Sequence, residues 1–124
     1  MLKNFRAYQT SVKLYKSCEK VWGPPHLLEQ LKRSTSSIAL NLAEGSERVT
    51  DRDQRRFYRM AMGSLRESQA ILDLLPAYPA NELSKKLADE AAAQIFGLCR
   101  SLDKKLTTTG SENGEPGTEN GKTD

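Results

Sequence analysis

The fold is indicated most directly by residues 26–45, which read HLLEQLKRSTSSIALNLAEG. Apolar or small positions recur there at alternating steps of three and four: Leu28, Leu31, Thr35, Ile38 and Leu42. That spacing places them on one face of an α-helix. Gly45 stands where glycine commonly ends a helix. The segment therefore predicts an amphipathic helix from about His26 to Gly45, with its apolar face turned toward a core.

Small side chains are unusually frequent along this predicted helix. They are Ser34, Ser36, Ser37, Ala39 and Ala43. Because such side chains take little space, we expect the backbone of another helix to approach closely at this face.

Three further segments carry the same periodicity, and we expect helices over about residues 4–22, 51–75 and 81–106. Thr50 or Asp51 can cap the second of these, and prolines at 24, 25, 76 and 79 separate the segments. The inner face of the helix over 51–75 is predicted to be Phe57, Ala61, Ser64, Leu65, Ser68, Ile71, Leu72 and Leu75. That of the last helix is predicted to be Leu83, Leu87, Ala91, Ile95, Leu98, Leu102 and Leu106.

No segment shows the alternation of polar and apolar residues that strands require. Four helices with short connections favour antiparallel neighbours. The predicted fold class is therefore all-α: an antiparallel up-down-up-down four-helix bundle over residues 1–106. Residues 107–124 contain no large apolar side chain, so we expect a disordered acidic tail.

The charge is divided unevenly between these two parts. The formal net charge of the 124 residues is +3. In residues 107–124 four acidic residues stand against Lys122, so the tail is near −3 and the body is near +6. No apolar run is long enough for a membrane span or a signal peptide, and we expect a cytoplasmic protein with no membrane partner. Cys18 and Cys99 are expected to be buried thiols.

The sequence lacks the common catalytic and metal-binding patterns. His26 is the single histidine, and its place at a helix start suggests a partly exposed residue. The Glu-x-x-His pairs of di-iron bundles are missing, and Gly63-Ser64 lies inside a helical pattern, unlike a phosphate-binding loop. We therefore predict no catalytic residues, no metal site and no cofactor, and do not expect an enzyme.

Two polar pairs interrupt the predicted inner faces. Asn41 and Glu44 share one face of their helix, as do Ser64 and Glu67, so the pairs could meet across neighbouring helices. We interpret the four residues as a buried hydrogen-bonded network that fixes the register of the bundle.

The clearest electrostatic feature is a stripe of arginines. It consists of Arg48, Arg52, Arg55, Arg59 and Arg66, with Arg56 beside it. Steps of four, three, four and seven place the stripe on one helical face. Arginine suits bidentate phosphate contacts, so the stripe is a candidate surface for RNA or DNA. The alternative is a solvated face whose arginines pair with neighbouring acids such as Asp51 and Asp53.

The chain also resembles a known family at two motifs. These are residues 37–45, SIALNLAEG, and residues 57–67, FYRMAMGSLRE. In order and separation they resemble the four-helix bundle proteins named for 23S ribosomal RNA intervening sequences, over about residues 4–106. The resemblance implies a bundle that assembles as a ring, typically a homopentamer. The architecture is also similar to the accessory variability determinant of diversity-generating retroelements, which implies nucleic acid and a reverse transcriptase as partners.

Three functional hypotheses follow from these features. The first is a non-catalytic oligomer that binds RNA or DNA through the arginine stripe. The second is an interaction scaffold whose basic surface docks an acidic protein or a reverse transcriptase. The third is a structural oligomer whose arginines only solubilise the surface or pair between subunits.

Overall fold

Four α-helices make up most of residues 2–109, the part of the chain that the computed structural model describes. They are α1 (Arg6–Ser17), α2 (Pro25–Ser46), α3 (Asp51–Leu74) and α4 (Pro79–Thr109). Single 3-10 turns, η1 (Leu2–Asn4) and η2 (Cys18–Lys20), lie on either side of α1. Residues 2–109 include no strand. The predicted all-α class is confirmed.

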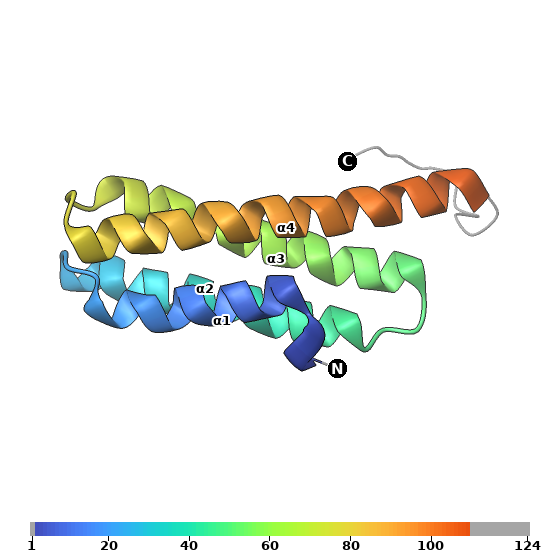
Figure 1. Cartoon of the computed structure of the whole chain (residues 1–124), viewed down its shortest axis with the longest axis horizontal. Coiled ribbons are helices and arrows are strands. Elements are labelled where there is room, and N and C mark those ends of the chain that lie inside the picture. The colour runs from blue at the N-terminus through green and yellow to red at the C-terminus, as the bar shows by residue number, and fades with distance from the viewer. Residues whose placement is uncertain (1, 110–124) are drawn as a thin grey trace.

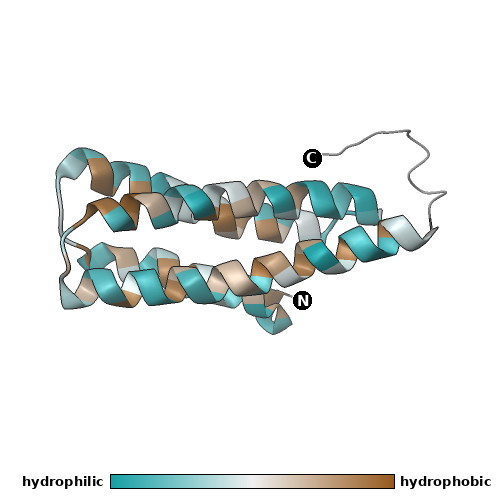
Figure 2. Ribbon diagram, turned by 90° about the horizontal axis from the view of Figure 1, so that it is seen from above, coloured by the Kyte–Doolittle hydropathy of each residue, from teal (hydrophilic) through white to brown (hydrophobic). Residues whose placement is uncertain are grey.

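The helices lie alongside one another in a long bundle (Figure 1). The α1–α2 and α3–α4 connections lie at one end, and the α2–α3 connection lies at the other, near the last turns of α4 (Figure 1). This arrangement is compatible with the predicted up-down-up-down packing. Hydrophilic and hydrophobic residues alternate along the turns of the helices, as amphipathic segments require (Figure 2).

A single core of aliphatic side chains runs through the bundle, with members from every helix. The most deeply buried large members are Leu14, Leu31, Ile38, Leu42, Leu65, Leu72, Ile95 and Leu106. Burying each of these side chains stabilises the fold by about 1.5–3 kcal/mol. The three-and-four spacing of the sequence predicted nearly all of this core.

The predicted helix boundaries differ from the observed ones in α1 and α4. The helix predicted over residues 4–22 is shorter, because α1 ends at Ser17 and only the 3-10 turn η2 follows it. Pro79, which was expected to lie in the break before α4, instead begins it. A proline at the first helical position is favoured, because its missing N–H would have no partner within the helix. The helix also continues three residues past Leu106, to Thr109. The rest of the predicted tail, residues 110–124, lies outside the described residues.

Two predicted inner-face assignments were wrong. Tyr58 is buried, with 5% of its surface exposed, whereas its neighbour Phe57 is only half-buried. Leu83 is 53% exposed, and buried Ser84 faces the core in its place. In both cases the buried residue is the one next in sequence to the predicted residue, about 100° away around the helix axis. Helical spacing alone does not decide which of two adjacent positions faces the core.

Gly45 was expected to cap the C-terminus of α2, but it lies within the last turn, before the observed cap residue Glu47. A Cβ atom on Gly45 would lie 2.7 Å from Tyr58 Cε1 and 3.0 Å from Phe57 Cβ. Glycine is therefore required here by the close approach of α3, and this contact fixes the α2–α3 spacing at the end that carries the arginines.

Candidate nucleic-acid interface

The start of α3 sets the position of the arginines. The Thr50 side chain accepts a hydrogen bond from the backbone N–H of Asp53 at 3.1 Å, as predicted for an N-cap. Asp51 and Asp53 lie in the first turn, where the helix dipole favours negative charge. Because this cap fixes the first helical residue, it also fixes the direction in which the arginines that follow are presented.

Four of the predicted arginines gather on one surface. A depression on the outside of the bundle is lined by Arg52, Arg55, Arg56, Arg59 and Met60. We call these five residues the arginine surface. Met60 is 46% exposed and adds an apolar side chain to the lining of the depression. The sequence spacing correctly predicted that these four arginines share one face of α3.

Asp103 on α4 binds two of these arginines, which the sequence analysis did not predict. Its Oδ1 atom accepts hydrogen bonds from Arg55 at 3.0 Å and from Arg59 at 2.9 Å. The Arg55 side chain is 25% exposed, that of Arg59 is 50% exposed and that of Asp103 is 43% exposed. A guanidinium carries five N–H donors, so one bond to Asp103 leaves most donors of each side chain for another acceptor.

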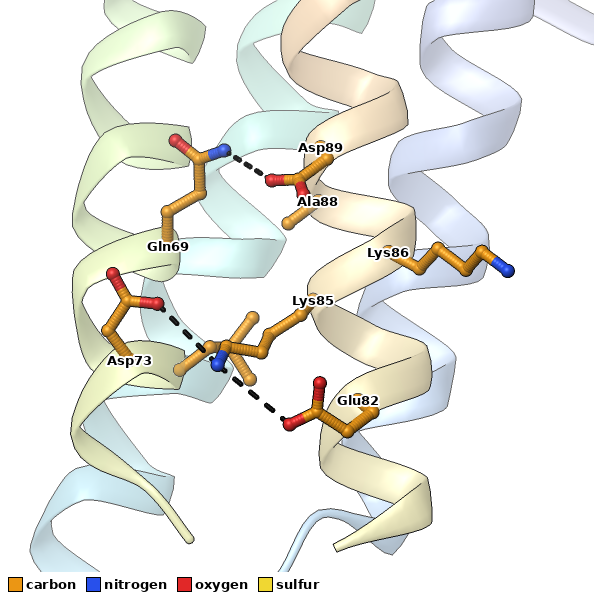
Figure 3. A pocket seen from close by; sticks show the side chains of 8 residues that line it. Gln69, Asp73, Glu82, Lys85, Lys86, Ala88 and Asp89 are labelled. Carbon is orange, nitrogen blue, oxygen red and sulfur yellow. Dashed lines mark hydrogen bonds and ion pairs between the residues drawn. The ribbon is translucent and has the colours of Figure 1, made fainter. Parts of the chain in front are cut away.

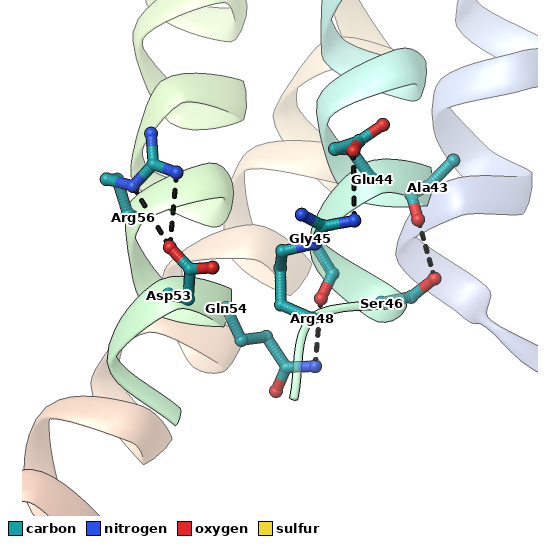
Figure 4. Close-up of polar contacts among 8 residues, drawn as sticks. All are labelled: Ala43, Glu44, Gly45, Ser46, Arg48, Asp53, Gln54 and Arg56. Carbon is teal, nitrogen blue, oxygen red and sulfur yellow. Dashed lines mark hydrogen bonds and ion pairs between the residues drawn. The ribbon is translucent and has the colours of Figure 1, made fainter. Parts of the chain in front are cut away.

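Arg56 lies on the other edge of the arginine surface. Its Nε and Nη2 atoms donate to Asp53 Oδ1 at 3.2 and 3.1 Å (Figure 4). Its guanidinium also lies 4.5 Å from the centre of the Phe57 ring. The cation–π contact and the two hydrogen bonds to one carboxylate oxygen hold Arg56 in one orientation, contributing about 0.5–1 and about 0.2–1 kcal/mol at an exposed site.

The predicted stripe is broken at both of its ends. Arg48 lies in the α2–α3 connection and not on a helix, and it pairs with Glu44 at 3.1 Å (Figure 4). It is nevertheless brought near the arginine surface, because its guanidinium lies 5.5 Å from the Phe57 ring. Arg66 is seven residues beyond Arg59, about 10 Å along the axis, and donates to Gln69 at 2.9 Å. Arg66 is therefore separate from the arginine surface.

The α2–α3 connection that carries Arg48 is itself tied down. Gln54 Nε2 donates to the Gly45 carbonyl at 3.0 Å, and Ser46 donates to the Ala43 carbonyl at 2.8 Å (Figure 4). The last turn of α2 and the first turn of α3 are thus linked directly, which limits the movement of Arg48 relative to α3.

The predicted polar network exists only in part. Ser64 and Ser37 share a hydrogen bond of 2.8 Å between α3 and α2, and Asn41 donates to the Ser37 hydroxyl at 3.2 Å. Asn41 and Ser64 are thus joined through Ser37. Glu44 and Glu67 are exposed and lie outside this network. The prediction was wrong for these two carboxylates, since both are exposed to solvent and so avoid the cost of burying a charge.

Other interhelical hydroxyl pairs were not predicted. Ser34 and Ser68 pair at 2.7 Å between α2 and α3, and both are buried. Ser17 and Ser84 pair at 2.6 Å between α1 and α4. These short side chains allow the close approach that the serine-rich face of α2 predicted, and each hydroxyl satisfies the other in the core.

The two cysteines are half-buried, and less enclosed than predicted. Burial raises the pKa of the Cys18 thiol above its ordinary value of 9.0, although hydrogen bonds with Ser84, Ser17 and Thr35 oppose the rise. Burial also raises the pKa of Cys99, which lies beside the arginine surface. The positive charge of Arg59 lowers that pKa, and the negative charge of Asp103 raises it. Both thiols are protonated at neutral pH.

A second depression lies between α3 and α4, toward the opposite end of the bundle (Figure 3). Most of its charged side chains bind one another or a neighbouring amide. Lys85 lies 3.7 Å from Asp73 and 3.8 Å from Glu82, and Gln69 donates to Asp89 at 3.0 Å. This mixture of signs gives the depression no net preference for an anion, in contrast with the arginine surface.

Within residues 2–109, no group of three or more His, Cys, Asp or Glu side chains could hold a metal ion. His26 is exposed at the first turn of α2, as predicted. None of the described helices combines the length and apolar character needed to cross a bilayer.

Comparison with known proteins agrees with the two motifs and the helical fold. No curated protein matches the chain. A family profile described as 23S rRNA-intervening sequence protein matches residues 3–108. That match spans all four helices and includes both motifs at residues 37–45 and 57–67. The chain belongs to the 23S rRNA-intervening sequence protein family.

Proposed function

We propose that the protein is a non-catalytic oligomer that binds nucleic acid through the arginine surface. The observation that carries the proposal is the convergence of Arg52, Arg55, Arg56 and Arg59 around one depression. Phosphate groups of RNA or DNA are the acceptors that suit such a set of planar, permanently charged donors. The contacts are to the nucleic-acid backbone, so binding depends weakly on base sequence.

The acidic partners of these arginines do not cancel the positive charge. Asp103 is shared between Arg55 and Arg59, and Asp53 pairs with Arg56. Exposed ion pairs of this kind are worth only about 0–1 kcal/mol each. A phosphate can therefore replace or share such a carboxylate at small cost, which supports phosphate binding over a purely solvated face.

Self-association is part of the proposal, with a homopentamer as the expected form by resemblance. Large apolar side chains remain on the surface of the single chain, including Leu40, Leu74 and Phe96, each more than half exposed. Contacts between subunits would remove such side chains from water. A ring would also repeat the arginine surface around its axis and strengthen the field that attracts a polyanion.

The test is the salt dependence of binding to a short labelled RNA and to a duplex DNA. If four arginines each neutralise one phosphate, affinity should fall roughly 50-fold for single strands and roughly 150-fold for duplex between about 50 and 200 mM salt. The variant Arg52→Gln/Arg55→Gln/Arg59→Gln should lose most of this dependence. An affinity that does not change with salt would refute phosphate contact.

A matched control is available on the same fold. Lys13, Lys20 and Lys86 are exposed and lie outside the arginine surface. Replacing all three with glutamine removes the same charge from elsewhere, and this variant should bind almost as the wild type does. The oligomeric mass of all three proteins, measured by sedimentation, must be the same for the comparison to hold.

The alternative function is a protein scaffold, for example one that docks a reverse transcriptase. It is favoured by an exposed aromatic pair at the other end of the bundle, where the Trp22 and Tyr78 ring centres are 5.2 Å apart. Failure to bind any RNA or DNA at low salt, together with retention of a protein partner that Trp22→Ala abolishes, would favour the scaffold.

A further inference from the structure

An acidic segment, residues 110–124, follows α4 in the sequence, and the last turns of α4 contact the arginine surface. Asp103 and Lys105 on α4 contact the first turns of α3, at 2.9–3.0 Å from Arg59 and Arg55 and at 3.6 Å from Asp51. The last turns of α4 and the α2–α3 connection lie at the same end of the bundle (Figure 1). α4 therefore reaches its last residue, Thr109, at the end of the bundle that carries the arginines.

The charge of this segment is opposite to that of the arginine surface. Residues 110–124 carry Glu112, Glu115, Glu119 and Asp124 against Lys122, a side-chain charge of −3. They contain no large apolar side chain that could dock in the core. Three other depressions in residues 2–109 are lined by charges of both signs, whereas the charged residues that line the arginine surface are all basic.

The length of the segment permits contact. Asp103 is six residues before Thr109, about 9 Å along a helix. Fifteen residues can span at most about 50 Å, and the three residues up to Glu112 about 10 Å. The three residues up to Glu112 are thus barely long enough to cover the distance from Thr109 back to Asp103. The longer stretches up to Glu115 and Glu119 are more than long enough to reach Arg52, Arg55 and Arg59.

We infer that residues 110–124 dock on the arginine surface through their carboxylates and compete there with nucleic acid. This inference rests on the proposed function, since it assigns a regulator to the same surface. The carboxylates act as an internal substitute for phosphates, and Asp103 already demonstrates in the structure that a carboxylate fits between Arg55 and Arg59. A long polyanion displaces the segment because it offers many more charges.

The expected size of the effect follows from effective concentration. A short tether holds its end at an effective concentration on the order of 1 mM. If the segment bound the arginine surface with a dissociation constant of about 0.2 mM, the effective concentration would be about five times that constant. The surface would then be free of the segment about one sixth of the time. Apparent nucleic-acid affinity would then be reduced about sixfold at low salt.

The experiment compares the full chain with a chain that ends at Thr109 and with a full-length Glu112→Gln/Glu115→Gln/Glu119→Gln/Asp124→Asn variant. Both altered proteins should bind a labelled RNA about threefold to tenfold more tightly at about 50 mM salt, and the gain should vanish near 300 mM. The gain should also vanish when Arg52, Arg55 and Arg59 are replaced with glutamine. Equal or weaker binding after truncation would overturn the inference.

A second readout works without nucleic acid. The Nε–Hε resonances of Arg52, Arg55, Arg56 and Arg59 should shift when residues 110–124 are removed, whereas that of Arg66 should not. Shifts without any nucleic-acid binding would uphold the docking of the segment and refute the proposed function. Nucleic-acid binding by the full chain, with no shift and no gain on truncation, would uphold the function and refute the docking.

Discussion

Replacing Asp103 with asparagine tests the arginine surface most sharply, because it separates binding from stability. The Asp103 carboxylate accepts from Arg55 at 3.0 Å and from Arg59 at 2.9 Å. Its negative charge therefore repels a phosphate that binds the other N–H donors of the same two arginines. We expect the Asp103→Asn variant to be less stable than the wild type and yet to bind nucleic acid more tightly.

The magnitude can be worked from these contacts. A phosphate on the outward N–H groups of Arg55 or Arg59 would lie about 6 Å from the Asp103 carboxylate, on the far side of the guanidinium. Repulsion at that distance is about 0.7 kcal/mol at the dielectric constant of water and about 1.4 kcal/mol at half that value. Removing the charge should tighten binding about threefold to tenfold.

The loss of stability is set by the two ion pairs. Their side chains are 25–50% exposed, so each pair contributes only about 0.2–1 kcal/mol. The free energy of unfolding should therefore fall by about 0.5–2 kcal/mol, which urea denaturation can measure. Opposite signs for binding and stability exclude a variant that is merely misfolded.

The assay is fluorescence anisotropy of a labelled RNA at about 50 and 200 mM salt. The control is Asp89→Asn, which makes the same charge change on α4. Asp89 accepts from Gln69 and lies fourteen residues, about 21 Å, before Asp103. Equal gains for both variants would show that only net charge matters. Unchanged or weaker binding by Asp103→Asn would refute the assignment of phosphate contacts to Arg55 and Arg59.

Three further predictions concern the bundle itself. Gly45→Ala should cost about 1–3 kcal/mol in urea denaturation, because its Cβ would lie 2.7 Å from a buried aromatic ring. Gly63→Ala, which meets nothing within 4 Å, should instead stabilise α3 by about 0.5–1 kcal/mol, and equal effects would contradict this account. Ser68→Ala should cost about 1 kcal/mol by removing the partner of Ser34, and a double alanine variant should cost less than the sum of the two single changes. Full additivity would argue against a direct pair. Burial raises the pKa of Cys18, so above pH 9 the unfolded thiol loses its proton before the folded one and stability should decline, as urea midpoints between about pH 8 and 10.5 would reveal. Cys18→Ala should lessen that decline, and an identical pH profile for the two proteins would count against it.

Features that depend on neighbours along the chain were predictable from the sequence. The Thr50 cap, the breaks at the prolines and the repeating apolar positions involve residues within about one turn of each other. For the same reason the grouping of Arg52, Arg55, Arg56 and Arg59 could be predicted, since it follows from helical geometry alone. The two motifs, which are also local, were enough to indicate the family.

Features that depend on the offset and rotation of one helix against another were not predictable. Nothing in the spacing indicates that Asp103, forty-four residues after Arg59, would lie against the arginines. The exposure of Glu44 and Glu67 and the contact that requires Gly45 likewise depend on how α2 meets α3. The sequence by itself therefore determined the helices and the face on which the arginines stand. Only the tertiary structure decided which carboxylate they bind, because side-chain packing between helices sets the axial register and local periodicity does not.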